Sequence, residues 1–261
     1  MGDHNVSKVD VRGCKVRVMR GGKGPTLLFL HGAGGAATWL PFMQTLARKF
    51  DVIVPSHPGF GETDAPAWLD NIHDMAYFYL DFIEELGVQN VHLVGLSLGG
   101  WIAAEIAVRN ASRLKTVTLV GSAGIYLKDA QHIDTFLCSD EQRIRDCFYD
   151  EKLAEEMIAR LLKPENEDVF LKNELTTAKM VWHPRSYDPN LHKWLHRINV
   201  PTLLLWGEQD RLKPKEYAYE FQRLIPGSKA IVLPECGHLP NVEKADRFCD
   251  ELSSFVTQAG V

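Results

Sequence analysis

The sequence predicts an α/β fold in which a mostly parallel sheet carries helices on both faces. Short apolar runs rich in Val, Ile and Leu recur along the 261 residues, and segments with helical spacing separate most of them. This alternation is typical of parallel sheets, because each crossover helix covers one face of the sheet. A second observation is the turn GLSLG at residues 95–99, which joins an apolar run to a helical segment. It places a serine where a strand of that sheet ends.

The elements before residue 121 follow this alternation. Residues 9–11 and 14–18 alternate apolar and polar side chains around Arg12 and Gly13, which predicts a β-hairpin. Residues 26–30 are apolar almost throughout, as expected of a strand that is buried on both faces. The remaining elements predicted here are helices at 40–50, 74–86 and 97–110, and strands at 52–54, 91–96 and 117–120.

The alternation stops between about residues 123 and 195, where no segment has a convincing strand pattern. Ser139 opens a helix-start signature, an apolar stripe at helical spacing runs over 153–162, and 169–182 is a further helical segment. The alternation then resumes with strands at 202–206 and 230–233 and helices at 215–224 and 242–256. A helical insertion between two strands can lie over the carboxyl edge of a parallel sheet, where ligands bind.

Composition and charge exclude several classes of protein. The net charge of −5 gives no basic footprint for nucleic acid, and no apolar stretch is long enough to span a membrane, so we expect neither as a partner. The start of the chain lacks the pattern of a signal peptide. Five scattered cysteines without paired spacing predict reduced thiols, a cytoplasmic location and no metal site. The oligomeric state stays open, with a homodimer as one option.

The turn at 95–99 has the pattern of a nucleophile elbow. Small residues two places on either side of Ser97 permit a tight turn, in which side chains at Gly95 and Gly99 would collide with neighbouring backbone. The turn lifts the serine hydroxyl out of the sheet and directs the first N–H groups of the following helix toward its target. The alternative is a glycine-rich turn that carries a solvated serine.

A serine hydroxyl is a poor nucleophile at neutral pH and needs a base held in one tautomer. His238 is predicted as the base, because it follows the strand at 230–233 and precedes the last helix. Asp210 is predicted as the acid that orients it, with Glu208 as the local competitor. The resulting chain order of Ser97, Asp210 and His238 is the one expected of a nucleophile elbow in an α/β protein.

The oxyanion hole needs two backbone N–H groups close to the serine. One is predicted from Leu98, directly after the nucleophile, and the other from Ala33 in the glycine-rich loop 31–36, with Gly34 as second choice. His31 is expected to brace this loop. A phosphate-binding cradle is the alternative for the loop, but the Gly-Lys-Ser/Thr ending is absent.

Five pieces in order resemble the α/β-hydrolase superfamily over nearly the full length of the chain. They are HGAG at 31–34, PGFGETD at 58–64, GLSLG at 95–99, WGEQD at 206–210 and GHLP at 237–240. The resemblance implies an α/β-hydrolase fold with an eight-stranded sheet and a helical cap over 124–195, between core parts at 1–123 and 196–261. It implies no cofactor.

Within that superfamily the chain looks most like capped bacterial carboxylesterases and hydrolases of aromatic meta-cleavage products. The serine nucleophile speaks against epoxide hydrolases and haloalkane dehalogenases. Carbon–carbon hydrolases usually carry a proline in the oxyanion loop and an aromatic residue after the histidine, whereas this chain has Gly34, Gly35 and Leu239 there. The prediction is therefore hydrolysis of small-molecule carboxylic esters through an acyl-enzyme. Carbon–carbon cleavage of 2-hydroxy-6-oxo-dienoates is the alternative, and a receptor with a residual triad is a third reading.

The cap is expected to shape the acyl pocket. Trp182 and Arg185 lie near its end, and Arg185 could hold a substrate carboxylate through two hydrogen bonds. The alternative for Arg185 is a solvated side chain or a pair with Asp188. Gly34 and Leu239 complete the predicted substrate-binding residues. Cys236, close to the predicted base, is expected to be a small loop residue rather than a reactive thiol.

Overall fold

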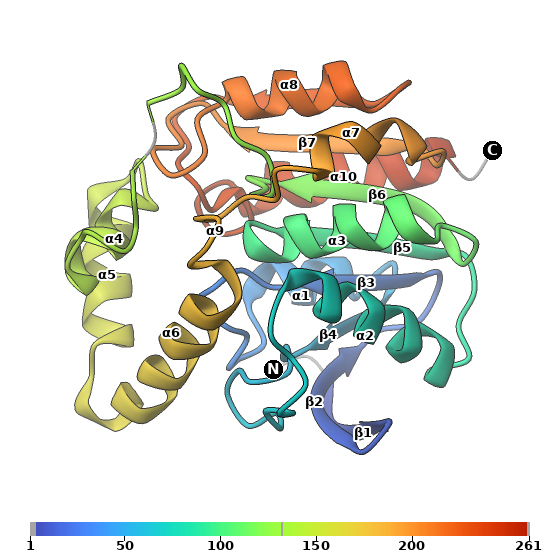
Figure 1. Ribbon diagram of the computed structural model, residues 1–261, viewed down its shortest axis with the longest axis horizontal. Helices are drawn as coiled ribbons and strands as arrows, with labels where there is room; N and C mark the ends of the chain where they lie inside the picture. Colours follow the sequence, from blue (N-terminus) through green and yellow to red (C-terminus); the bar gives the residue numbers. More distant parts are fainter. Residues whose placement is uncertain (1–3, 132, 260–261) are drawn as a thin grey trace.

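The computed structural model describes residues 4–131 and 133–259, and its centre is an eight-stranded sheet (Figure 1). The strand order is β1-β2-β4-β3-β5-β6-β7-β8, and β2 is antiparallel to both of its neighbours while the pairs from β4 to β8 are parallel. The strands are β1 (His4–Val11), β2 (Cys14–Gly21), β3 (Thr26–Leu30), β4 (Asp51–Pro55), β5 (Val91–Leu96), β6 (Leu114–Val120), β7 (Thr202–Gly207) and β8 (Lys229–Leu233). The predicted mostly parallel sheet is confirmed.

Helices cover both faces of the sheet. The helices are α1 (Pro41–Leu46), α2 (Ile72–Glu85), α3 (Leu98–Arg109), α4 (Asp140–Asp146), α5 (Glu151–Leu161), α6 (Glu167–Val181), α7 (Leu191–Trp194), α8 (Glu216–Leu224), α9 (Pro240–Glu243) and α10 (Ala245–Ala259), with short 3₁₀ turns at Pro164–Asn166 and Leu195–Arg197. Side chains of α2, α3 and α8 share one core with the sheet, and those of α1 and α10 share the other.

The central strand β5 shows why its sequence lacks a polar face. All six of its residues are buried, and the neighbours Leu93 and Val94 belong to the cores on opposite faces of the sheet. A strand covered on both faces keeps mostly apolar side chains, because successive side chains point to opposite faces. Its one polar side chain, His92, is buried with Nδ1 2.9 Å from the hydroxyl oxygen of Thr116.

Two elements differ most in length from the prediction. The helix expected over 40–50 is a short α1, which begins at Pro41 and gives way to a turn after Leu46. The hairpin strand expected at 9–11 extends back to His4. This strand lies at the edge of the sheet and is largely exposed, so its first residues need no alternating apolar pattern.

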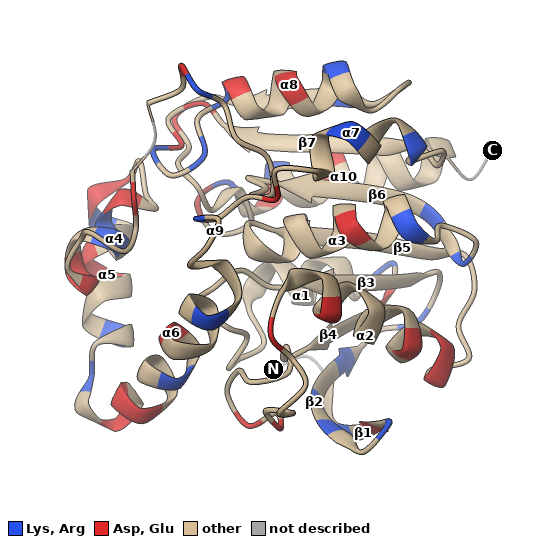
Figure 2. Cartoon of the chain, in the orientation of Figure 1, with Lys and Arg blue, Asp and Glu red and all other residues tan. Residues whose placement is uncertain are grey.

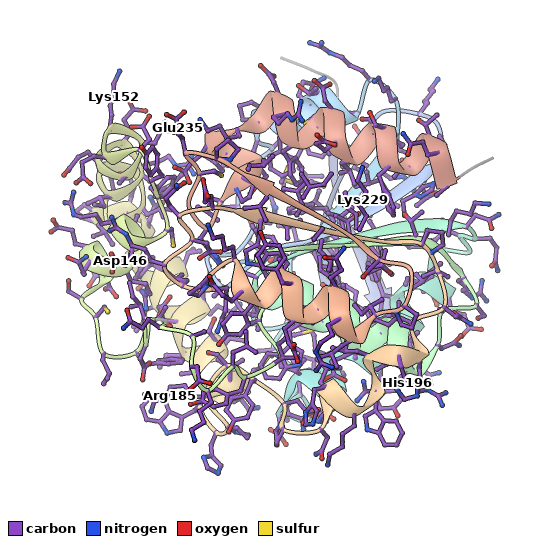
Figure 3. The ribbon with its side chains drawn as sticks, turned by 90° about the horizontal axis from the view of Figure 1, so that it is seen from above. Asp146, Lys152, Arg185, His196, Lys229 and Glu235 are labelled. Carbon is purple, nitrogen blue, oxygen red and sulfur yellow. The ribbon has the colours of Figure 1, made fainter. Side chains whose placement is uncertain are left out.

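Helices α4, α5 and α6 lie together at one end of the molecule, in the views of both Figure 1 and Figure 3. They have a small core of Ile144, Phe148 and Ala154, which packs against Leu239 and Val242 of the main body. The side-chain oxygen of Ser139 accepts the amide of Gln142 over 3.2 Å and starts α4, as the helix-start signature predicts. Three side chains of α6 bind the loop that follows β4, as described below.

Acidic and basic residues are interspersed along α4, α5 and α8 (Figure 2). None of the helices in the described part of the chain combines the length and the hydrophobicity needed to cross a membrane.

Candidate active site

Ser97 lies in a strained turn between β5 and α3. Its φ of 54° and ψ of −111° are unusual for a residue that is not glycine. A Cβ atom on Gly95 would lie 2.2 Å from the carbonyl oxygen of Gly99, and one on Gly99 would lie 2.2 Å from the carbonyl oxygen of Leu30. Both glycines are therefore required for the backbone to turn this tightly, as the sequence pattern predicts.

His238 and Asp210 meet at the ends of β8 and β7. The Nδ1 of His238 lies 2.7 Å from Oδ2 of Asp210, and both side chains are buried. The other carboxylate oxygen of Asp210 accepts the amides of Leu212 and Lys213 over 2.9 and 2.8 Å. A carboxylate that takes part in three such contacts is held firmly in one orientation.

The competitor Glu208 is placed elsewhere. It is exposed and pairs with Lys215 over 3.0 Å, and this ammonium holds the pKa of Glu208 below its usual value. The strand β6 ends at Val120, and a Cβ atom on the following residue, Gly121, would lie 3.1 Å from Nδ1 of His238. Of these candidates, the structure thus brings Asp210 and not Glu208 to His238.

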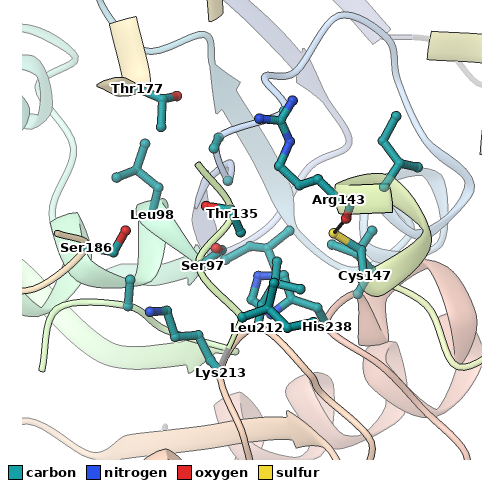
Figure 4. Close-up of a pocket in the computed structure, with 18 of the residues that line it drawn as sticks. Ser97, Leu98, Thr135, Arg143, Cys147, Thr177, Ser186, Leu212, Lys213 and His238 are labelled. Carbon is teal, nitrogen blue, oxygen red and sulfur yellow. Dashed lines mark hydrogen bonds between the residues drawn. The ribbon is translucent and has the colours of Figure 1, made fainter. Parts of the chain in front are cut away.

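The second ring nitrogen of His238 has no protein partner. Its Nε2 is buried and makes no hydrogen bond within the described residues. Ser97 and His238 line the same cavity and lie next to one another in Figure 4. The imidazole therefore has one nitrogen fixed by Asp210 and the other free on the side of the serine, which is the arrangement that a general base requires.

The glycine-rich loop after β3 lies beside the serine. A Cβ atom on Gly32 would lie 3.3 Å from Cβ of Ser97, and Ala33, Gly34 and Leu98 all line the cavity. The amides of Ala33 and Leu98 donate to no protein acceptor within residues 4–131 and 133–259. Two free N–H groups on either side of a serine suit a developing oxyanion.

Two histidines whose rings are in contact brace this loop. The Nε2 of His31 accepts the amide of His57 over 2.9 Å, so His31 is neutral and its Nδ1–H donates to the carbonyl of Gly32 over 2.6 Å. His57 lies over it, with ring centroids 3.7 Å apart, and bonds to Tyr79. Burial lowers the pKa of His31 to about 4, which keeps the brace uncharged at neutral pH.

A cavity of about 400 Å³ opens between the carboxyl edge of the sheet and the α4–α6 helices. Residues of both parts line it, and most of its surface is apolar. Among the lining residues are Ser97, Tyr126, Asp134, Phe136, Arg143, Ile144, Phe148, Arg160, Phe170, Arg185, Lys213, His238 and Leu239. Such a volume accommodates a small organic substrate.

Arg185 and Trp182 are placed differently from one another. Arg185 lines the cavity and pairs with Asp134 over 2.6 Å, so its partner is neither solvent alone nor Asp188. The predicted substrate contact Trp182 does not line the cavity. Its ring is 54% exposed and lies under the Arg185 guanidinium, 4.3 Å from it. This cation–π contact holds the ring beside the guanidinium of Arg185, outside the cavity lining.

The cysteines near the site are unreactive. Burial raises the pKa of Cys147 and of Cys236 to about 12, so both thiols are protonated at neutral pH. All five cysteines are free. The expectation of a small, inert loop residue at 236 agrees with this environment.

Two residues at the site carry no motif that marks them in the sequence. Asn173 of α6 accepts the amide of Gly61 over 2.9 Å and donates to the carbonyl of Gly34 over 3.3 Å, so it ties the oxyanion loop to α6. Lys172 and Thr176 reinforce the same contact through the carbonyls of residues 59, 61 and 63. The second residue is Lys213, which lines the cavity three positions after Asp210. Its place in the loop that carries the predicted acid is the one feature of the sequence that points to it.

A family model described as alpha/beta hydrolase fold matches residues 25–245. A 2-hydroxy-6-oxo-6-(2'-aminophenyl)hexa-2,4-dienoic acid hydrolase from Metapseudomonas resinovorans is 27% identical over 268 residues, covering 96% of this chain and 90% of that protein. A 2-hydroxymuconate semialdehyde hydrolase from Pseudomonas sp. (strain CF600) is 26% identical, covering 95% and 92%. The crystal structure of a candidate lipase from Acinetobacter baumannii AYE superposes with a TM-score of 0.81 at 25% identity, covering 98% and 92%.

The family model spans the serine turn, the acid and the histidine, and the solved structure has the same architecture over the whole chain. These matches agree with the strand order and with the placement of Ser97, Asp210 and His238 at one edge of the sheet. The chain is a hydrolase that belongs to the α/β-hydrolase fold family.

Proposed function

We propose that the protein cleaves a carbon–carbon bond in 2-hydroxy-6-oxo-dienoates, the ring-opened products of aromatic meta-cleavage. The observation that carries the proposal is the full-length similarity to two hydrolases of such compounds, which spans 95% or more of this chain and so includes the α4–α6 helices over the cavity. The sequence alone ranked ester hydrolysis first. The relatives favour the alternative instead.

In the proposed reaction, the free Nε2 of His238 takes the proton of the Ser97 hydroxyl, and Asp210 stabilises the imidazolium that forms. The serine oxygen adds to the 6-oxo carbon of the substrate. The amides of Ala33 and Leu98 donate to the oxyanion of this tetrahedral species. These roles follow from the hydrogen bonds and the free donors already described.

The carbon–carbon bond breaks only if the departing carbon can accept the electron pair. In the keto tautomer of the dienoate, this pair delocalises onto the 2-oxo oxygen, so the leaving group is a dienolate. The imidazolium of His238 returns its proton to that group. The acyl group remains on Ser97 until water, deprotonated by His238, adds to it and releases a carboxylic acid.

Ester hydrolysis is the second candidate, and two observations favour it. The loop proline and the aromatic residue after the histidine that accompany carbon–carbon cleavage are absent, since Gly34, Gly35 and Leu239 line the cavity at those positions. The candidate lipase also shares the fold at 25% identity. An ester needs no stabilised carbon leaving group, so the same triad would suffice.

The two functions are separated by comparing kcat/KM for two substrates. One assay follows the bleaching of the coloured 2-hydroxy-6-oxo-6-phenylhexa-2,4-dienoate, and the other follows nitrophenolate release from 4-nitrophenyl butyrate. We expect the dienoate to be preferred by tenfold or more, about 1.4 kcal/mol in the transition state. Ser97→Ala is the control and must abolish both signals. A preference for the ester overturns the proposal and promotes the second candidate.

A further inference from the structure

The amine of Lys213 reaches the cavity that holds the serine. Its side chain leaves the loop after β7 and extends into the space between Ser97 and Ser186 (Figure 4). The side chain is only partly accessible to solvent. A lysine at this place brings a positive charge within the same small volume as the nucleophile and the base.

The backbone beneath this lysine is fixed on both sides. Its amide donates to Oδ1 of Asp210 over 2.8 Å, and its carbonyl accepts the indole N–H of Trp206 over 2.8 Å. The Asp210 carboxylate that binds His238 therefore also fixes the backbone from which the Lys213 side chain extends. A charge positioned in this way needs little reorganisation when a ligand arrives.

Lys213 differs from two of the arginines that line the cavity in having no carboxylate partner. Arg143 pairs with Asp140 and Glu174, and Arg185 pairs with Asp134. Within the described residues, no carboxylate oxygen lies within 4.0 Å of Nζ of Lys213, which lies 5.5 Å from the centroid of the Tyr217 ring. Arg160 also lacks an acidic partner there, but it is an exposed side chain.

Burial lowers the pKa of Lys213 to about 8, while the carboxylates of Asp210 and Asp134 act in the opposite direction. The amine is thus still mostly protonated at neutral pH. A charge kept in a partly buried place without a partner is unfavourable for the free protein. An anionic ligand would pair with this charge and remove the cost, so the site should favour anionic ligands over neutral ones.

We propose that Lys213 determines specificity by binding a carboxylate of the substrate beside Ser97. The proposal rests on the proposed function in one respect, because the dienoate is a substrate that carries such a carboxylate. Arg185, which the sequence suggested for this task, is already neutralised by Asp134. Within the described residues, Lys213 is the partly buried lysine of the cavity that no carboxylate pairs with, whereas the unpaired Arg160 is exposed.

The test compares an anionic and a neutral ester of similar size, mono-4-nitrophenyl glutarate and 4-nitrophenyl pentanoate. The measured quantity is the ratio of their kcat/KM values. In Lys213→Gln we expect this ratio to fall by about tenfold or more, as for the loss of a hydrogen bond to a charged group. Lys213→Arg should restore most of it. Lys215→Gln is the matched control, because Lys215 lies in the same loop, pairs with Glu208 and does not line the cavity.

Binding without turnover gives the second readout. The dissociation constant of each ester is measured calorimetrically with the Ser97→Ala protein, with and without Lys213→Gln. Tighter binding of the anionic ester that depends on Lys213 supports the proposal. Equal affinity for the two esters with Lys213 intact overturns it, and so does a kcat/KM ratio that Lys213→Gln leaves unchanged. Failure to cleave the dienoate would instead refute the proposed function, and the ester comparison would still decide the role of Lys213.

The same ratio should depend on pH. Because the protonated amine binds the anion, the preference for mono-4-nitrophenyl glutarate should decline as the pH rises past 8 and should persist in Lys213→Arg. The charged and titratable groups near the amine are the carboxylates of Asp210 and Asp134 and the phenol of Tyr217, and His238 and Arg185 line the same cavity. A ratio that follows the same pH profile in wild type and in Lys213→Arg would assign the titration to one of these groups and contradict the proposal.

Discussion

The amide of Lys213 and the ring of His238 are held by the two oxygens of one carboxylate, that of Asp210, over 2.8 and 2.7 Å. The group that orients the base thus also fixes the loop that brings an ammonium into the cavity. A change at Asp210 is therefore expected to affect both the chemical step and the recognition of charge, and the two effects can be measured separately.

Replacing Ser97 tests the nucleophile. Ser97→Ala should lower kcat by about a thousandfold or more, because no other hydroxyl occupies the elbow beside His238. The midpoint of urea unfolding should stay close to that of wild type, since the substitution removes one oxygen and keeps the Cβ. Mass spectrometry of the protein after fluorophosphonate treatment provides the independent check. A labelled peptide that lacks residue 97 would contradict the assignment.

Asp210→Asn should lower kcat by about 10³-fold or more without changing the fold. The reason is geometric. If the asparagine amide nitrogen faces His238, it forces the wrong tautomer of the ring; if it faces the other way, it meets the two backbone amides that Oδ1 now accepts.

Glu208→Gln is the matched control for this change. Glu208 is two positions away, is exposed and pairs with Lys215, so its loss should change kcat less than about threefold. Circular dichroism confirms the fold of both variants. A severe loss in Glu208→Gln combined with a mild one in Asp210→Asn would reverse the assignment of the acid.

The elbow glycines can be tested by stability instead of activity. Gly99→Ala should reduce the free energy of unfolding by about 3 kcal/mol or more, because its Cβ would lie 2.2 Å from the carbonyl oxygen of Leu30. Gly34→Ala should change it by less than about 0.5 kcal/mol, since no atom lies within 4 Å of the added carbon. Urea titrations measure both. Equal losses in the two variants would mean that the turn relaxes around the methyl group.

The parts of the site that could be predicted from the sequence are those in which backbone geometry restricts the residue types near one another in the chain. The turn around Ser97 needs glycine at 95 and 99 for steric reasons that the sequence displays directly. His238 and Asp210 could be chosen because each follows a strand, and parallel strands end at the same edge of the sheet.

The contacts that could not be predicted depend on segments without regular structure. The partner of Arg185 is Asp134, which lies 51 positions earlier in the irregular stretch before α4. Nothing in a local pattern selects Asp134 over Asp188, because the choice is made by packing around Phe136 and Trp182. The exposure of Trp182 follows from the same packing. The burial of the Lys213 amine likewise depends on residues that are distant in the chain.

Removing the charge at Lys213 should stabilise the protein at neutral pH. The amine has a pKa of about 8 in the folded protein against 10.5 when unperturbed, so between these values the unfolded chain binds more protons. Below pH 8 the charged amine therefore lowers the wild-type free energy of unfolding by its full amount. This loss of stability becomes smaller as the pH rises toward 10.5. Because the side chain is not fully buried, we expect Lys213→Met to gain about 1 kcal/mol at pH 7.

This gain should shrink when urea unfolding is repeated at pH 10, where the amine is neutral in the folded protein and already partly deprotonated in the unfolded chain. Lys215→Met is the control and should give no gain, because the pairing with Glu208 raises the pKa of Lys215. A loss of stability in Lys213→Met at pH 7 would mean that the amine has a stabilising partner in the free protein. A gain of stability accompanied by a lost preference for anionic substrates would show that the protein retains an unfavourable charge because that charge binds the substrate.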